Sequence, residues 1–154
     1  MSKRGYCAIG MFQPKTEDNL GILFRSAHLL GADFVFTIGN RYRRQFSDTS
    51  NTLAHVPYFA FPDLSDFLNH LPQPRHAVKL VGIEVLDQAE PLETFKHPER
   101  AIYILGGEDR TLSGDMLAAC DHVVRFTSKH CLNVSVSGSI VLYDRQAKQL
   151  RHEI

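Results

Sequence analysis

The sequence predicts an α/β fold in which a parallel sheet is flanked by helices. Short apolar runs typical of buried strands alternate with segments whose apolar residues recur at helical spacing. This alternation is typical of units in which each strand is followed by a helix, and such units form parallel sheets. No internal repeat, low-complexity tract or linker divides the 154 residues. We therefore expect a single domain over residues 1–154, long enough to bury a hydrophobic core.

The expected elements follow one another regularly along the chain. Strands are expected at residues 6–12, 33–38, 58–61, 78–83, 101–105 and 122–126, and helices at 17–30, 63–70, 114–120 and 134–150. Thr16 is the expected N-cap of the first helix, and Gly31 is its expected C-terminal stop. The strand at 101–105 contains no charged residue and is expected to be fully buried.

Composition excludes several classes of protein. Seventeen basic residues balance seventeen acidic ones, so any contact with RNA must come from a local patch. Cys7, Cys120 and Cys131 are odd in number and widely spaced, which indicates neither a disulfide framework nor a zinc site and favours a reducing cytoplasm. The apolar stretch that follows the first residues is too short for a signal peptide, and no apolar run is long enough to span a membrane.

The loops after the predicted strands indicate where a ligand binds. In open α/β sheets, ligands lie beyond the carboxyl ends of the strands. The segment where the first strand ends, residues 10–14, lacks the glycine fingerprint of dinucleotide-binding proteins, and the chain has no phosphate-binding Gly-Lys-Ser/Thr loop. Gly106 and Gly107 follow the strand at 101–105 and leave room for a ligand to approach the backbone. Together with the loop at 127–133, they predict one shared pocket.

Three segments carry a family resemblance. They are Asn19-Leu20-Gly21-Ile22-Leu23-Phe24-Arg25-Ser26-Ala27, Leu105-Gly106-Gly107-Glu108-Asp109 and Leu132-Asn133-Val134-Ser135-Val136-Ser137. In this order and at this spacing, they resemble the three motifs of the SpoU/TrmH family, RNA 2′-O-ribose methyltransferases of the SPOUT superfamily. The resemblance covers about residues 6 to 146. It implies a C-terminal trefoil knot, an exception to the rule that protein chains are unknotted.

The resemblance also implies a chemistry and its residues. The reaction is methyl transfer from S-adenosylmethionine to a ribose 2′-hydroxyl, without a metal. Arg25 matches the arginine that activates this hydroxyl; because a guanidinium pKa lies above about 12, Arg25 is expected to stabilise developing negative charge rather than to remove a proton. Asn19 and Glu108 match residues that orient the arginine or the acceptor, and Asn133 and Ser135 match residues that position the phosphate or hydroxyl.

The resemblance implies cofactor contacts that are made mostly by backbone groups, at Gly106, Gly107, Arg125, Phe126 and Leu132. The chain departs from the family pattern at two of these loops. Thr111 stands where the family usually has glycine, and the segment 125–127 stands where the family often has Ile-Pro. Both departures lie in the loops expected to bind the cofactor and not at the expected catalytic residues.

Each motif also has an ordinary structural interpretation. Asn133 and Ser135 suit the N-terminus of the last helix as simple caps. Asn19 and Arg25 suit a solvated helix surface. Arg25 follows the core position Phe24, however, so we expect it to be partly buried at the edge of the apolar face.

A basic run follows the second predicted strand. Arg41, Arg43 and Arg44 flank a tyrosine, and arginine both binds phosphate and stacks on bases. We expect these arginines to contact RNA, the alternative being a solvated loop. Lys129 and His130 face the same choice, and a lone loop histidine is more often a surface residue.

The resemblance is to the minimal members of the family, many of which methylate transfer RNA as homodimers. The last helix carries apolar residues on more than one face, at 140–143, which also favours a homodimer. Two alternatives remain open. One is an RNA-binding module of the same fold that has lost catalysis, and the other is a methyltransferase that acts on a base nitrogen.

Overall fold

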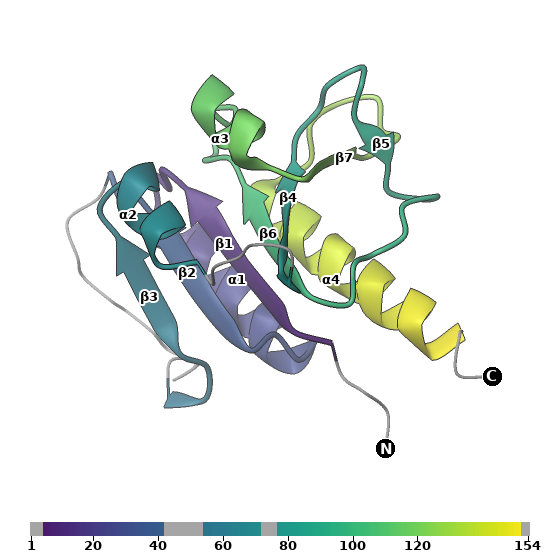
Figure 1. Cartoon of the computed structure of the whole chain (residues 1–154), viewed down its shortest axis with the longest axis horizontal. Helices are drawn as coiled ribbons and strands as arrows, with labels where there is room; N and C mark the ends of the chain where they lie inside the picture. Colours follow the sequence, from purple (N-terminus) through teal and green to yellow (C-terminus); the bar gives the residue numbers. More distant parts are fainter. Residues whose placement is uncertain (1–4, 42–53, 72–76, 152–154) are drawn as a thin grey trace.

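The computed structural model describes residues 5–41, 54–71 and 77–151, and within them one parallel sheet has helices on both faces (Figure 1). The strands lie in the order β3-β2-β1-β6-β4-β7-β5. They are β1 (Cys7–Phe12), β2 (Phe34–Ile38), β3 (Tyr58–Phe61), β4 (Lys79–Ile83), β5 (Glu90–Pro91), β6 (Ala101–Leu105) and β7 (His122–Arg125). The helices are α1 (Glu17–Leu29), α2 (Leu64–Asn69), α3 (Gly114–Ala119) and α4 (Val134–Arg151).

The predicted α/β class is confirmed, and each predicted element is present to within two residues at either end. The sequence missed β5, which pairs with β7 at the edge of the sheet. A strand of two residues shows no periodicity, and its proline is tolerated only because the strand lies at an edge. No helix in the described part of the chain is long and apolar enough to cross a membrane.

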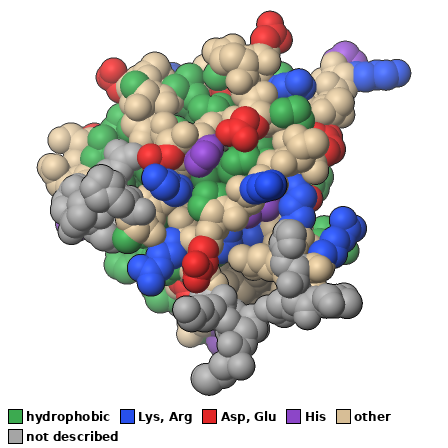
Figure 2. Space-filling model, turned by 45° about the vertical axis from the view of Figure 1, so that its right-hand side comes forward, with side chains coloured by type: hydrophobic (Ala, Val, Ile, Leu, Met, Phe, Trp, Pro, Cys, Tyr) green, Lys and Arg blue, Asp and Glu red, His purple; other side chains and the backbone are tan. Residues whose placement is uncertain are grey.

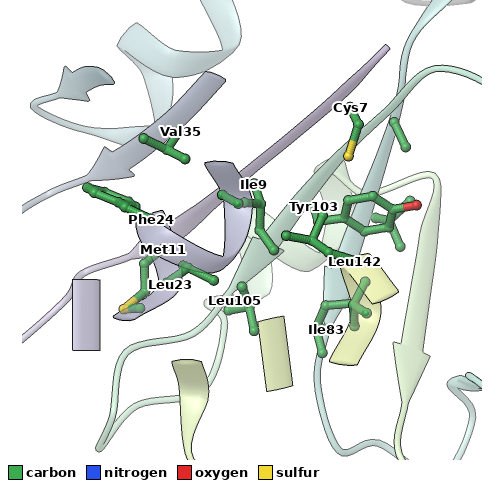
Figure 3. Packing of buried hydrophobic residues seen from close by; sticks show 14 of the residues in the cluster. Cys7, Ile9, Met11, Leu23, Phe24, Val35, Ile83, Tyr103, Leu105 and Leu142 are labelled. Atoms are coloured by element: carbon green, nitrogen blue, oxygen red, sulfur yellow. The ribbon is translucent and has the colours of Figure 1, made fainter. Parts of the chain in front are cut away.

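The core lies on both faces of the sheet around β6, whose residues are all buried, as predicted. Ile9 and Met11 of β1 point to the face covered by α1 and α4, where they pack with Leu23 and Leu142 (Figure 3). Their neighbours along β1 belong to the core of the opposite face, which α2 and α3 cover. The alternation along one strand therefore fixes which helices share a face.

Helices α1 and α4 pack closely because small residues lie between them. A Cβ atom at Gly138 would overlap Leu23 Cδ1, so the glycine allows the two helices to approach. Ser139 Oγ donates a hydrogen bond to Ser26 Oγ at 2.7 Å. This packing brings the first turn of α4 against the first turn of α1, where the site described next is formed.

Candidate active site

A cavity of about 330 Å³ lies beyond the carboxyl ends of β4, β6 and β7. Its wall includes Glu84 and Val85 after β4, residues 106–111 after β6, residues 126, 128 and 131–134 after β7, and Asn19 from α1. The structure therefore brings together the strand-end loops that the sequence predicted to share a pocket.

Gly106 and Gly107 are required by the chain's own backbone. A Cβ atom at Gly106 would lie 2.6 Å from the carbonyl oxygen of Arg110, and one at Gly107 would lie 2.5 Å from the carbonyl oxygen of Gln13. Neither distance is found for real Cβ atoms. The two glycines therefore serve the packing of the chain itself, in addition to lining the cavity where the sequence argument expected a ligand to approach the backbone.

One side chain joins the three segments that carry the family resemblance. Asn19 donates from Nδ2 to Glu108 Oε1 at 3.1 Å. Its Oδ1 accepts hydrogen bonds from Asn133 Nδ2 at 3.1 Å and from Ser135 Oγ at 3.2 Å, and its carbonyl oxygen accepts a second contact from Ser135 Oγ at 2.6 Å. We refer to Thr16, Asn19, Glu108, Asn133 and Ser135 as the Asn19 cluster.

Glu108 fastens the second segment to the N-terminus of α1. Its carboxylate accepts hydrogen bonds from the backbone N–H groups of Lys15 and Thr16 and from the Thr16 hydroxyl. Burial raises the pKa of Glu108, but the hydrogen bonds from Asn19, Thr16 and Lys15 outweigh it and lower the pKa to about 2. The group is therefore an ionised acceptor at neutral pH, favourably placed at a helix N-terminus, and is unsuited to act as a proton donor.

The prediction that Thr16 caps the first helix is right about its position and wrong about its side chain. Thr16 occupies the N-cap position of α1, as predicted, but its side chain makes no capping hydrogen bond to its own helix. The hydroxyl instead donates to Glu108 at 2.7 Å. The Glu108 carboxylate accepts from the N–H groups of Lys15 and Thr16, which precede α1, so it anchors the chain at the entry to the helix rather than replacing the cap.

Asn133 combines the structural role and the site role that the sequence left open. Its Oδ1 accepts hydrogen bonds from the N–H groups of Ser135 at 2.9 Å and Val136 at 3.3 Å, so Asn133 does cap α4. Its other amide atom, Nδ2, contacts Asn19. Ser135 does not cap the helix with its side chain; it is buried and binds Asn19 instead.

Arg25 is exposed, so the predicted partial burial is wrong. Position 25 lies three residues from Ile22 and four from Leu29, which are 55% and 69% exposed, and helical spacing places all three on the outer side of α1. Val136, Ile140 and Tyr143 are the corresponding exposed apolar residues of α4. We refer to these six residues as the outer α1–α4 face. Within the described part of the chain, the Arg25 side chain neither lines the cavity nor makes a hydrogen bond.

The expected cofactor residues lie at the cavity with one exception. Gly106, Gly107, Phe126 and Leu132 all line it. Arg125 does not; its side chain points to the β5 side, where Nε donates to the carbonyl oxygen of Ala89 at 3.2 Å. The resemblance implied a backbone contact from Arg125 or Phe126, and of these two residues only Phe126 lines the cavity.

Charged side chains at the rim of the cavity form ion pairs with one another. Arg41 forms an ion pair with Asp109 at 2.6 Å, and Lys15 lies 3.5 Å from the same carboxylate. The hydrogen bond from Arg41 is the main reason that the pKa of Asp109 is lowered to about 2. Basic and acidic side chains are likewise interspersed on the face shown in Figure 2. Arg43 and Arg44 lie outside the described residues.

Glu84 is a cavity residue that the sequence analysis missed. Its Oε2 accepts a hydrogen bond from the N–H of Leu112 at 2.8 Å, and its Oε1 accepts one from the N–H of Val85 at 2.9 Å. The side chain thus connects the loop after β4 with the loop after β6. The signal was present, because an acidic residue directly after a predicted strand lies where α/β proteins bind ligands.

The chain is similar to known proteins over most of its length. Residues 7–143 match the family described as "SpoU rRNA Methylase family". A mouse protein named tRNA (guanosine(18)-2′-O)-methyltransferase TARBP1 is 26% identical over an alignment of 139 residues. The match covers 86% of this chain and 9% of the mouse protein. The chain thus corresponds to a small part of that relative.

Solved structures show the same fold at low identity. The SpoU methyltransferase AviRb from Streptomyces viridochromogenes, in complex with AdoMet, is 18% identical with a TM-score of 0.83, covering 96% of this chain and 62% of AviRb. A structure titled "Structural insights into the 2-OH methylation of C/U34 on tRNA" is 19% identical with a TM-score of 0.80, covering 97% and 99% of the two chains. These likenesses confirm the SPOUT fold that the resemblance predicted, and the match over residues 7–143 shows that the chain belongs to the SpoU rRNA methylase family.

Proposed function

We propose that this chain is an S-adenosylmethionine-dependent RNA 2′-O-ribose methyltransferase. The observation that carries the proposal is the position of Asn19, which lines the cavity and binds residues from the other two motif segments at once. Family membership supports the reaction class, and the AdoMet bound to AviRb supports the cofactor.

The cavity suits the cofactor in size and chemistry. About 330 Å³ lies within the range of about 300–1,000 Å³ typical of small-molecule sites. Leu105, Phe126 and Leu132 offer apolar surface for an adenine ring, while the negative charges of Glu84 and Glu108 favour a cationic molecule in the cavity through the electrostatic field rather than by direct contact. When bound, S-adenosylmethionine supplies a methyl group on a positively charged sulfur, which is already reactive toward a nucleophile.

The chain's own residues have to orient and activate the acceptor hydroxyl. Asn19 is held in one orientation by Glu108 on one side and by Asn133 and Ser135 on the other, so the pocket edge is preorganised before RNA binds. We assign to Arg25 the stabilisation of the negative charge that develops on the ribose oxygen. A guanidinium performs this without giving up its proton.

Arg25 requires a second copy of the chain for this role. It lies on the outer α1–α4 face, where solvent weakens its electrostatic effect. We propose that two copies associate through this face, as Ile22, Leu29 and Tyr143 are more than half exposed there. Association would exclude water from Arg25. Light scattering at micromolar concentration should show a dimer, and a monomer would contradict the assembly.

Transfer RNA is the proposed substrate. The family description names rRNA, whereas the mouse relative and the structure of nearly equal length are both named for tRNA. Arg41, Arg43 and Arg44 are proposed to contact the RNA backbone. We place the enzyme in the cytoplasm, where cysteine thiols stay reduced.

The product of the reaction tests the proposal. The chain is incubated with methyl-labelled S-adenosylmethionine and either unmodified tRNA or rRNA, and the digested RNA is analysed by mass spectrometry. We expect label in a 2′-O-methylnucleoside from tRNA. Label in a methylated base would instead support a base methyltransferase, and RNA binding without any labelled product would support a binding module.

A further inference from the structure

Glu84 is placed to recognise the cofactor through a side chain. It follows β4 directly, lines the cavity, and connects two of the loops that form its wall. We propose that the Glu84 carboxylate binds the two ribose hydroxyls of the cofactor. The inference rests on the proposed function, because it assumes that this cofactor occupies the cavity.

The remaining hydrogen-bonding capacity of Glu84 fits a vicinal diol. Each carboxylate oxygen already accepts one backbone N–H, from Val85 or from Leu112. A carboxylate has about four acceptor positions, so each oxygen keeps one for a ligand. Two hydroxyl donors on adjacent carbons match two acceptor oxygens on one carbon. An acidic side chain beyond a strand end binds ribose hydroxyls in the same way in dinucleotide-binding α/β proteins.

The other two carboxylates at the cavity already bind other groups of the protein. Glu108 is used by Asn19 and by the N-terminus of α1. Asp109 is used by Arg41 and Lys15. Among the described residues, by contrast, no cationic side chain forms an ion pair with Glu84. Glu84 is therefore the cavity carboxylate that has acceptor positions left and, among the described residues, no cation paired with it, so it suits a neutral donor such as a hydroxyl.

A purely structural role is the competing explanation. Glu84 could serve only to hold the Leu112 loop in place, and its replacement would then weaken every ligand of the cavity equally. Binding of S-adenosylhomocysteine and of its 2′,3′-dideoxyribose analogue separates the two roles, because only the first carries the hydroxyls. The measurement uses calorimetry and needs no RNA and no turnover.

Three proteins are compared: the unmodified chain, Glu84→Gln and Asp87→Asn. Asp87 is an exposed acidic residue of the same loop that does not line the cavity, so its change controls for the loss of one charge. The unmodified chain and Asp87→Asn should prefer S-adenosylhomocysteine over the dideoxy analogue by about tenfold or more. Glu84→Gln should reduce this preference to about threefold or less, because the amide keeps only one acceptor oxygen.

A third ligand tests which part of the cofactor Glu84 contacts. The compound 5′-methylthioadenosine carries the ribose diol but lacks the amino-acid group, so Glu84→Gln should weaken its binding as well. A loss for S-adenosylhomocysteine alone would mean a contact to the ammonium group and would overturn the assignment. An equal loss for S-adenosylhomocysteine and the dideoxy analogue would overturn it in favour of the structural role.

The unmodified chain keeps the proposal falsifiable if Glu84→Gln does not fold. Equal affinity of the unmodified chain for S-adenosylhomocysteine and its dideoxy analogue would overturn the role of Glu84 while leaving the methyltransferase proposal intact. Failure of the folded, unmodified chain to bind S-adenosylhomocysteine at all would instead overturn the proposed function, and the Glu84 inference with it.

Discussion

Two polar clusters hold the two ends of α4, and they differ in what surrounds them. The Asn19 cluster holds the first turn, beside the cavity and partly open to solvent. A second cluster holds the C-terminal half against the segment before β6. We refer to it as the His97 cluster, consisting of His97, Tyr103, Asp144, Arg145 and Lys148.

The His97 cluster is closed. Arg145 is 4% exposed and donates to the carbonyl oxygens of Pro98 and Glu99. His97 lies between the Tyr103 hydroxyl at 2.6 Å and the Asp144 carboxylate at 2.8 Å. A largely buried network whose members satisfy one another rigidifies the fold.

The comparison shows that similar residue types serve different purposes at the two ends of one helix. Asn19 and Glu84 line a cavity, so a change there should affect ligands more than folding. Arg145 and His97 are enclosed by protein, so a change there should affect folding more than ligands. Mutations in the two regions test whether ligand binding and folding stability are affected separately.

The largest effect is expected for Arg25→Ala, in the same motif segment as Asn19. Removing a preorganised group that stabilises transition-state charge costs about a hundredfold to a thousandfold in rate, so RNA methylation should fall by that factor. Cofactor affinity should stay nearly unchanged, because Arg25 is assigned to the acceptor. Methyl transfer to tRNA and calorimetry with S-adenosylhomocysteine measure the two effects.

Arg151→Ala, an exposed arginine at the end of α4, is the control for this experiment and should behave like the unmodified chain. If Arg25→Ala retained more than half of the activity on the cognate RNA, its catalytic role would be refuted.

At the other end of α4, Arg145→Met should destabilise the protein without changing the site. The substitution removes the buried guanidinium that donates to the carbonyl oxygens of Pro98 and Glu99, which should lower the free energy of unfolding by about 3 kcal/mol. Urea denaturation measures this loss. Below the unfolding transition, affinity for S-adenosylhomocysteine should be unchanged; a large loss of affinity in the folded variant would show that the two clusters are coupled.

The two clusters should also respond to acid in different pH ranges. Burial lowers the pKa of His97, opposed by Asp144 and aided by Lys148 and Arg145. The unfolded chain therefore takes up this proton first, and stability should fall as the pH drops below about 6.5 through the lowered folded-state value. The pKa of Glu108 is about 2 in the fold, so its contribution is present above 4.5 and lost only between 4.5 and about 2.

Denaturation at a series of pH values tests this separation. His97→Gln should remove the dependence just below pH 6.5 and leave the more acidic one, because the amide does not titrate. A variant with an unchanged profile in the upper range would show that another group titrates there.

The smallest effect is expected for the combined replacement of Arg41, Arg43 and Arg44 by alanine. RNA binding should weaken, and its salt dependence should flatten by roughly one unit of slope for each phosphate that the variant no longer binds. Arg41 is already paired with Asp109, so its share should be the smallest. Filter binding over a range of salt concentrations measures the slope. An unchanged slope would rule out the basic run as an RNA-binding segment, and cofactor binding serves as the control.

The fold was largely predictable because its strands and helices are long enough to show their periodicity. The exception, β5, is defined only by its pairing with β7. The exposure of Arg25 could not be predicted from spacing alone, because helical spacing groups it with Ile22 and Leu29, two apolar residues whose exposure only the structure shows. Adjacency to a core residue in sequence was the wrong criterion.

The site was predictable as a set of residues and not as a network. Motif resemblance identified Asn19, Glu108 and Asn133, but no local pattern shows that Asn19 bonds to a carboxylate 89 positions away. No local pattern predicts the ion pair between Arg41 and Asp109 either, because the two residues lie 68 positions apart. Such contacts depend on which loops the sheet order brings together, and that order is set by the whole chain.

Binding of the cofactor to the unmodified chain tests the central claim most directly, namely that the cavity beside the Asn19 cluster is a methyl-donor site. Calorimetry is performed with S-adenosylmethionine and S-adenosylhomocysteine, and circular dichroism confirms that the protein is folded. The account predicts saturable binding of both ligands, with one molecule per chain. The absence of binding at millimolar ligand, with the protein folded, would contradict it.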